Sequence, residues 1–476
     1  MTDRRNFETS SGIREQSKVT TRRNLLVTAM AVLCYPTLGR AAPAAGMTPE
    51  AEAEALAWVK ANARTFSEDP EPHELADAAK ALAGAQVIGI GEASHGSHED
   101  RLFKASLIRA LIERGQARII ALECNFLPGR ALDHYVQTGE GDPTKLMRAN
   151  GFFEIWQCEE MLDLITWARA WNLAGKPAVS IIGVDCQAVG RDADFALTWV
   201  AEHDKATAAA KRDELALVVG PDVRTKRIDV VVGGLSADQM QAQIAATKGL
   251  VDFLKAQSRW AALPGYDDAI SAARAAHQGL VAFELETKGA PAPADVSYYA
   301  RRDQFMADNL LARSGAVPAV YWAHNGHVVP ALGLFGSGET CGGYLRRALG
   351  KAYRSVIFEY DRATLFAKAT PPRAPAPPSS QPMQRLERPS FPGTLGSALS
   401  VLGFECFWVD LTSPPDTAAL RAWMAHPYRH DWPGSALVDG ELDPDSPDVA
   451  LAGRVDLLVF FRQVSPARFL PFVKTA

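Results

Sequence analysis

Short apolar runs that alternate with helix-forming segments are the feature of this chain that most limits its fold. Runs of strand length, rich in Val, Ile and Ala, lie at 86–91, 118–122, 179–184, 319–322 and 355–359. Apolar residues with helical spacing lie between or after them, at 101–114, 128–138, 157–174, 296–313 and 340–349. Strands that alternate with helices pair in parallel, because each helix carries the chain back across the sheet. The pattern predicts an α/β fold with a mainly parallel sheet flanked by helices.

The segment 190–295 differs in composition from the rest of the chain. It is rich in Ala, Leu, Lys, Asp and Gln and has no strand pattern, so we expect a helical insertion there. The α/β catalytic core would then consist of 48–189 and 296–476, with further strands near 404–410 and 455–461. A Pro-rich stretch at 370–394 is expected to be an extended loop without regular structure, because proline lacks the amide donor that helices and sheets use.

Residues 1–41 have the pattern of an export signal. Arg22 and Arg23 precede an apolar run at 25–38, and small residues including Ala41 and Ala44 follow it. Paired arginines before the run indicate the twin-arginine export machinery as a partner. The run is shorter than the ~20 residues of a spanning helix, so we expect cleavage and a periplasmic or secreted protein without a stable membrane anchor. The alternative is an uncleaved N-terminal anchor.

Charge and cysteine content narrow the class of partner and the redox chemistry. The formal net charge is −5, and no long basic run follows the first 40 residues, so nucleic acid is not an expected partner. The cysteines beyond the signal are odd in number and form no C-x-x-C pair. We expect them to be small buried hydrophobic side chains. One disulfide in an oxidising compartment is the alternative, with the pair left open. These cysteines are Cys124, Cys158, Cys186, Cys341 and Cys406.

The segment 91–99 concentrates acid–base side chains directly after the first apolar run. Its sequence is Gly-Glu-Ala-Ser-His-Gly-Ser-His-Glu, which places Glu92 three residues before His95. Ligands of parallel α/β sheets bind at the carboxyl ends of the strands, and a carboxylate beside an imidazole fixes its tautomer and raises its basicity. We therefore expect His95 to take a proton from water. The alternative is a structural turn in which Glu92 and Ser94 cap the next helix.

A second histidine-rich segment follows the run at 319–322. It has the sequence Trp-Ala-His-Asn-Gly-His and carries His324 and His327. Such a pair can bind a metal, donate a hydrogen bond to a developing oxyanion or supply an acid. Because parallel strands end at the same edge of a sheet, we expect these histidines to converge on the segment 91–99.

Three more acids end apolar runs, namely Glu123, Asp185 and Glu359. Acids in this position either solvate the rim of the sheet or line a site, and we assign Glu123 and Asp185 to the site. His426 and His430 are expected to be structural, because the proline between them prevents a regular helical pair. The chain has no G-x-S-x-G elbow, P-loop, dinucleotide fingerprint or H-E-x-x-H motif, which disfavours the chemistries built on them.

The order of these segments resembles the erythromycin esterase family. The likeness runs over roughly 85–360, through the opening G-E-A-S-H-G motif, a D-x-Y helix, a G-V-D strand end, an R-D-x-x-M-x-x-N helix and an A-H-N-x-H segment. It implies an α/β core with a helical insertion. The residues that carry it are 88–96 with Glu99, Asp133 and Tyr135, 182–185, Arg302, Asp303, Met306 and Asn309, and 323–327.

Members of that family hydrolyse macrolide lactones, and relatives have other roles. The resemblance implies that His95 is a general base activating water for attack on an ester carbonyl, with Glu92 and Glu123 assisting it. His324 and His327 would line the same cleft. Nine residues after His95, where the family pattern has arginine, the chain has lysine. Lysine keeps the charge and loses the bidentate fork. The substrate-binding residues that we expect are Lys104 and Asp185.

An exported hydrolase acting on a small-molecule ester or lactone is therefore the expected function, with macrolide resistance as one consequence. We expect no required cofactor, and hydrolysis assisted by a divalent metal is left open. One alternative is an exported divalent-metal-binding protein, and another is a hydrolase of a non-macrolide ester of the cell envelope. The ligands of the metal would be Glu92, His95, Glu123, His324 and His327.

Overall fold

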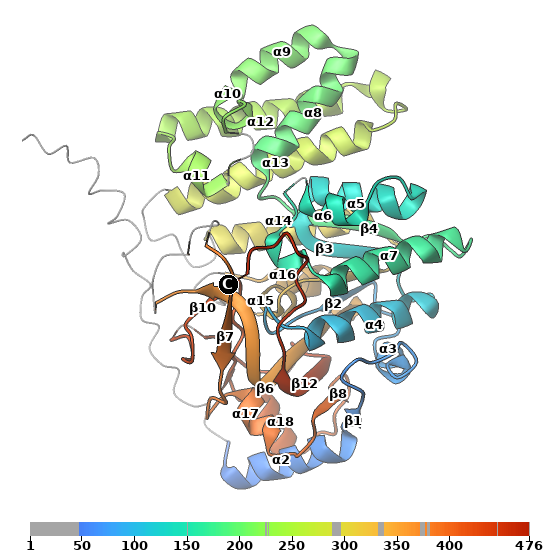
Figure 1. The fold of residues 1–476 in the computed structure, drawn as a ribbon, viewed down its shortest axis with the longest axis vertical. Coiled ribbons are helices and arrows are strands. Elements are labelled where there is room, and N and C mark those ends of the chain that lie inside the picture. The colour runs from blue at the N-terminus through green and yellow to red at the C-terminus, as the bar shows by residue number, and fades with distance from the viewer. Residues whose placement is uncertain are drawn as a thin grey trace, which may run out of the picture. The chain divides into compact units, whose positions relative to one another are not determined.

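A ten-stranded sheet runs through the part of the chain that the structure describes (Figure 1). Its neighbouring strands are, in order, β1 (Arg64–Thr65), β8 (Cys406–Asp410), β12 (Leu457–Val464), β6 (Tyr353–Ala369), β2 (Val87–Ile90), β5 (Ala319–Trp322), β3 (Ile119–Asn125) and β4 (Ser180–Asp185). From β12 to β4 every neighbouring pair is parallel. β1 and β8 extend one edge in antiparallel fashion. β7 (Gln384–Arg388) and β10 (Ala436–Leu437) also pair with β6, and β9 (Tyr428–Arg429) pairs separately with β11 (Asp448–Val449).

This computed structural model describes residues 47–149, 151–223, 226, 228–287, 297–331, 338–371, 377, 381–444 and 446–475. The predicted export signal at 1–41 lies outside these residues. None of the helices within the described ranges has the length and apolar character that crossing a membrane requires.

Helices cover both faces of the sheet because side chains of a strand point alternately to its two sides. Ile88 and Ile90 join a core cluster with α4 (Glu99–Glu113) and α7 (Glu159–Leu173), whereas Val87 joins a second cluster with α14 (Tyr298–Ser314) and α16 (Cys341–Leu349). The other helices of this part of the chain are α2 (Pro49–Asn62), α3 (Ala76–Ala81), α5 (Phe126–Thr138), α6 (Pro143–Arg148), α15 (Asn325–Val328), α17 (Leu395–Ser400) and α18 (Ala418–Ala425).

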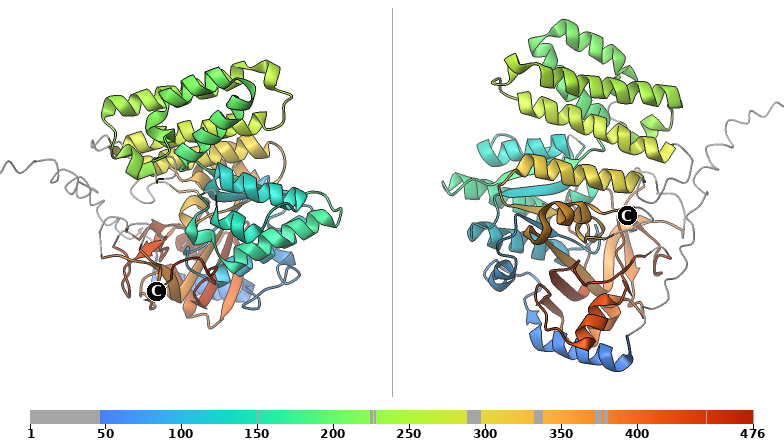
Figure 2. Two further views of the ribbon diagram at one scale, coloured as in Figure 1. Left: turned by 45° about the horizontal axis from the view of Figure 1, so that its top comes forward. Right: turned by 180° about the vertical axis from the view of Figure 1, so that it is seen from behind.

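The helices that lie between β4 and α14 in the sequence form a layer of their own (Figure 2). This layer has a separate hydrophobic core. Apolar side chains of α5 and α14, such as Phe126 and Phe305, pack against this core and connect the layer to the sheet. A capping box formed by Ser236 and Gln239 fixes the start of α12 (Ala237–Ala256). The helices are α8 (Val189–His203), α9 (Lys205–Glu214), α10 (Ala216–Val219), α11 (Ile228–Val232), α12 (Ala237–Ala256) and α13 (Tyr266–Thr287).

The predicted fold class is confirmed, and one local expectation is wrong. Within the Pro-rich stretch 370–394, residues 384–388 form β7, which pairs antiparallel with β6. These residues contain no proline, and Leu386 and Arg388 bury alternate side chains against the sheet. β6 is also longer than the expected strand 355–359, since it runs from Tyr353 to Ala369. The cysteines beyond the signal are all buried and free.

Candidate active site

Six of the seven predicted site residues lie at the carboxyl ends of four adjacent parallel strands, and Lys104 lies on α4. Glu92 and His95 follow β2, and His324 and His327 follow β5. Glu123 and Asp185 are the acids at the ends of β3 and β4, and the strands stand side by side in the order β2-β5-β3-β4. The topology therefore brings these acids and imidazoles to one edge of the sheet.

His95 is held at one ring nitrogen by a buried carboxylate. Its Nδ1 lies 2.7 Å from Glu92 Oε1, and Lys104 Nζ donates to Glu92 Oε2 at 2.9 Å. Burial alone would raise the pKa of Glu92, but Lys104 and His95 outweigh it and lower this pKa to about 2. Glu92 is thus a carboxylate at neutral pH, and its bond to Nδ1 places the basic lone pair of His95 on Nε2.

Buried polar groups on α4 hold the backbone around His95 in place. Arg101 donates to the carbonyl oxygen of His95, and Asp100 accepts from Ala93 N at 3.0 Å and from the Ser97 hydroxyl at 2.9 Å. A side chain at Gly96 would collide with the backbone of β6 at Phe366, so this close approach requires glycine. The ring of His95 also meets Trp156 edge-on, with centroids 5.2 Å apart.

His324 has a different environment, although its ring centroid lies 5.0 Å from that of His95. Its Nδ1 accepts a hydrogen bond from Gly326 N at 3.1 Å, so its proton is on Nε2. Burial, with the neighbouring His95 and His327, lowers the pKa of His324 to about 3. This ring is therefore neutral at physiological pH and serves as an N–H donor.

Arg302 on α14 links the two carboxylates that end β3 and β4. Its guanidinium donates to both oxygens of Asp185, at 3.0 and 2.9 Å, and to Glu123 Oε1 at 3.0 Å. Burial raises the pKa of Glu123, but His327 and Arg302 together hold it well below the ordinary value. Glu123 Oε2 in turn accepts from the backbone N of His324 at 3.1 Å, which fixes the start of the β5 loop.

His327 lies between two carboxylates. Its Nδ1 is 2.6 Å from Asp303 Oδ1, and its Nε2 is 3.2 Å from Glu123 Oε1. Burial lowers the pKa of His327, but Asp303 and Glu123 more than offset this and raise it to about 10. The imidazole is thus a cation at neutral pH, which makes it a fixed positive charge rather than a base.

The carboxylates named as metal ligands pair with cationic side chains, and the metal-binding alternative stays a prediction. In the described ranges, no three His, Cys, Asp or Glu side chains are arranged to hold a metal ion. The positive charge beside Glu123 and Asp185 comes from Arg302. The positive charge beside Glu92 comes from Lys104.

Lys104 is buried beneath the site rather than in a cleft. Its side chain has 0% exposure, its ammonium donates to Glu92 and to Ala323 O, and it lies 4.2 Å from the centre of the Trp322 ring. Burial lowers the pKa of Lys104 to about 8, with Glu92 opposing this effect. Its geometry is that of a residue positioning Glu92, while substrate contacts by Lys104 and Asp185 stay predictions.

Several residues of the site had no role assigned from sequence. Arg302 and Asp303 stood out only as part of a helix motif, and their partners are far away in the chain, since 179 residues separate Arg302 from Glu123. His98, the second histidine of the segment 91–99, directs its Nδ1 at Glu160 on α7. Trp156 donates to Glu123 O at 3.1 Å, and nothing in the local sequence indicates this contact.

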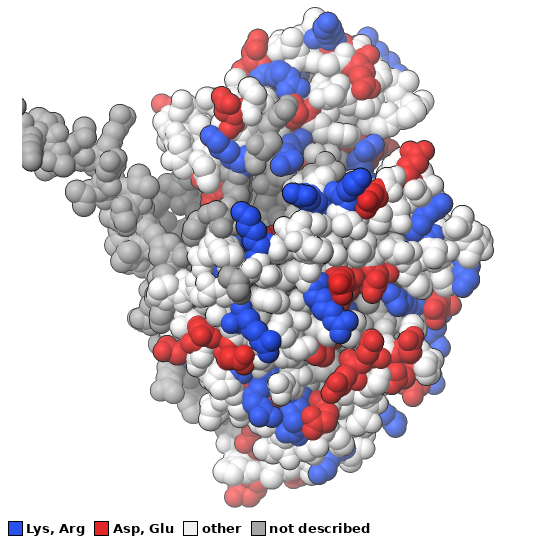
Figure 3. Space-filling model, viewed as in Figure 1, with Lys and Arg blue, Asp and Glu red and all other residues white. Residues whose placement is uncertain are grey.

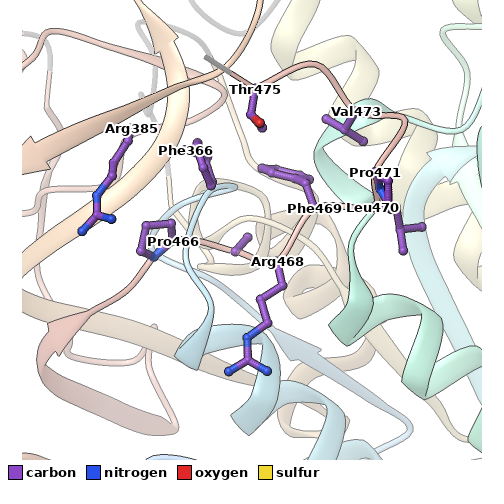
Figure 4. A pocket seen from close by; sticks show the side chains of 10 residues that line it. Phe366, Arg385, Pro466, Arg468, Phe469, Leu470, Pro471, Val473 and Thr475 are labelled. Carbon is purple, nitrogen blue, oxygen red and sulfur yellow. The ribbon is translucent and has the colours of Figure 1, made fainter.

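A cavity of about 430 Å³ lies next to the loop that carries His95 (Figure 4). The C-terminal segment 466–475 forms much of its wall, together with Phe366 and Arg385. The same segment is hydrogen-bonded to the loop, since Ala467 N donates to Gly96 O at 2.8 Å. Acidic and basic side chains are interspersed on the face of the molecule drawn in Figure 3.

Comparison with known proteins identifies the family model of erythromycin esterase over residues 112–464. The match begins after the segment 91–96. Curated relatives include the putative hydrolase YbfO of Bacillus subtilis (strain 168), 24% identical over 149 residues. Erythromycin esterases type I and type II of Escherichia coli are 28% and 27% identical over 104 and 106 residues. The aligned stretches span 31% of this chain and 32% of YbfO, and 22% of this chain and 25% of each esterase.

Three solved structures share the fold. A Bacillus cereus protein has a TM-score of 0.73 at 20% identity, over 88% of this chain and 99% of that protein. A succinoglycan biosynthesis protein has a TM-score of 0.72 at 17% identity, over 89% and 100%. A mutant of the erythromycin esterase EreC in its open conformation has a TM-score of 0.61 at 17% identity, over 86% and 98%.

Proposed function

The chain belongs to the erythromycin esterase family of hydrolases, and from that premise we propose that it hydrolyses a carboxylic ester or lactone with His95 as the general base. The observation that carries this proposal is the pairing of His95 Nδ1 with the Glu92 carboxylate at 2.7 Å. This bond leaves Nε2 as the atom that accepts a proton, and Glu92 stabilises the imidazolium that forms.

The first step is attack by water. Nε2 of His95 takes a proton from the water as its oxygen forms a bond to the carbonyl carbon, and the carbonyl π electrons move to oxygen. The Nε2–H of His324, beside the His95 ring, donates a hydrogen bond to this oxyanion.

The second step is collapse of the tetrahedral intermediate. The carbon–oxygen bond to the alcohol breaks, and the leaving oxygen takes the proton from the His95 imidazolium. An ester gives an acid and an alcohol, and a lactone opens to a hydroxy acid. Because the same proton is taken up and returned, the base is regenerated in each cycle.

A screen of the purified protein tests this proposal. We expect hydrolysis of at least one member of a panel of macrolides and simple esters, with and without a chelator. His95→Asn should lower kcat about 1,000-fold without loss of folding. His73→Asn, which removes an exposed imidazole, is the control. Near wild-type activity of His95→Asn would reject His95 as the base, and loss of activity on chelation would restore the metal alternative.

We also propose export through the twin-arginine machinery, on the basis of Arg22, Arg23 and the apolar run that follows. Replacement of both arginines by lysine should keep the protein in the cytosolic fraction. Unchanged fractionation would contradict this route. A periplasmic enzyme would meet its ester outside the cytosol, which suits a macrolide as well as an ester of the cell envelope.

A further inference from the structure

A short loop from a remote part of the chain lies against the catalytic ring. Residues 430–435 connect β9 to β10, and Gly434 of this loop faces His95. A methyl group at position 434 would lie 4.0 Å from His95 Cδ2, which is the ring carbon bonded to Nε2. Gly434 therefore borders the edge of the ring where the water and the carbonyl group must meet.

We infer that the side-chain size at position 434 sets the size of the electrophile that reaches Nε2 of His95. The inference rests on the proposed function, because it assigns the space in front of Gly434 to the groups attached to the reacting carbonyl. Glycine at this position admits an ester or lactone with a branched or cyclic group beside that carbonyl. A larger residue would restrict the site to small acyl groups.

The loop is held firmly enough to act as a wall. Trp432 Nε1 donates to Glu359 Oε1 at 2.8 Å, and the same oxygen lies 2.6 Å from His430 Nδ1. Asp431 accepts from Tyr360 at 2.8 Å. These bonds are buried, so movement of the loop would expose or unpair several polar groups at once. Glu359 therefore fixes the loop that faces His95.

Glycine is not needed at position 434 for backbone reasons. Its φ lies outside the left-handed region, unlike that of Gly440 in the next turn. Apart from its chain neighbours, the His95 ring atom at 4.0 Å is the sole atom within 4 Å that a Cβ would meet among those described. Alanine or valine can therefore be introduced without backbone strain. What the missing side chain provides is open space beside the ring.

Chemical modification measures access to His95 without relying on turnover. Diethyl pyrocarbonate transfers its ethoxycarbonyl group to an unprotonated imidazole nitrogen and releases ethyl carbonate. The modification rate of His95, followed by peptide mass mapping, is compared with that of the exposed His73. We expect Gly434→Val to lower the relative rate about tenfold and Gly434→Ala to lower it less. Gly249→Val, at a helical glycine whose Cβ would meet no atom within 4 Å, should leave it unchanged.

Equal rates in wild type and Gly434→Val would overturn the inference, and so would a wild-type His95 that does not react. Hydrolysis of p-nitrophenyl acetate and of its branched pivalate analogue supplies the second readout. We expect Gly434→Val to lower kcat/KM for the pivalate at least about tenfold more than for the acetate. Equal losses on both esters would also overturn it. If the reagent rates shift while no ester is hydrolysed, control of access stands and the proposed function fails.

Discussion

The loops after β2 and β5 each carry two histidines, yet the structure gives these rings different environments. In the β2 loop, His95 and His98 each direct Nδ1 at one carboxylate, Glu92 or Glu160. In the β5 loop, His327 lies between two carboxylates and is charged, whereas His324 accepts from a backbone amide and is neutral. One carboxylate leaves Nε2 of His95 as an acceptor, as the proposed base requires, and two carboxylates hold His327 as a cation. The neighbours of an imidazole decide its role more than its place in a motif.

The largest effect on kcat should come from removing Glu92, the single carboxylate beside the proposed base. Glu92→Gln presents an amide N–H to Nδ1, favours the tautomer with the proton on Nε2, and should lower kcat about 1,000-fold. It also leaves the Lys104 ammonium buried without its anion, which should cost about 3 kcal/mol of unfolding free energy. Steady-state kinetics and denaturant unfolding measure the two effects.

A double variant separates charge from packing in the same experiment. Glu92→Gln combined with Lys104→Met should recover most of the unfolding free energy and none of the activity. Glu113→Gln, an exposed position on α4, is the control. Recovery of activity together with stability would show that Glu92 acts on folding alone.

Removal of His324, the neutral imidazole, should have the next largest effect on kcat. His324→Leu removes the proposed oxyanion donor and should lower kcat about 100-fold. His324→Gln, whose amide offers an N–H, should recover part of the loss. Because the pKa of His324 is about 3, neither change should shift the acid limb of the pH–rate profile. A shifted limb would contradict the donor role, and His134→Gln on the surface is the matched control.

The positive charge of His327 should affect the pH dependence of the unfolding free energy. The pKa of His327 is raised from 6.5 to about 10, so its stabilising contribution is complete below pH 6.5 and is lost as pH rises through about 10. Unfolding free energy of the wild type should fall across this window, and that of His327→Gln should fall less. Parallel curves for the two proteins would show that the ring is not charged in the native state.

The smallest effect on kcat should come from replacing Asp100, which lies beneath the β2 loop. Burial raises the pKa of Asp100 from 3.8 to about 7, so the stability that its neutral form contributes is complete below pH 3.8 and is lost as pH rises through about 7. Asp100→Asn should flatten the unfolding free energy in this lower window and change kcat less than about threefold. A larger loss of kcat would place Asp100 in proton transfer.

The sequence by itself determined the alternating strands and helices of the core and the edge of the sheet where its acids and imidazoles gather. Apolar runs with a period of two or 3.6 residues predict strands and helices locally, and polar residues after parallel strands must meet at one edge. The strand β7 was missed because the prolines around 384–388 obscured a short segment that pairs with β6.

Only the tertiary structure decided which partners and charges surround each imidazole. These surroundings depend on burial and on charges from elements far apart in the chain, such as Arg302 and Glu123. It also placed Lys104 under Glu92 and Gly434 against His95, contacts that no local pattern encodes. A protonation state is set by the distances among all neighbouring charges, and these distances exist only in the folded chain.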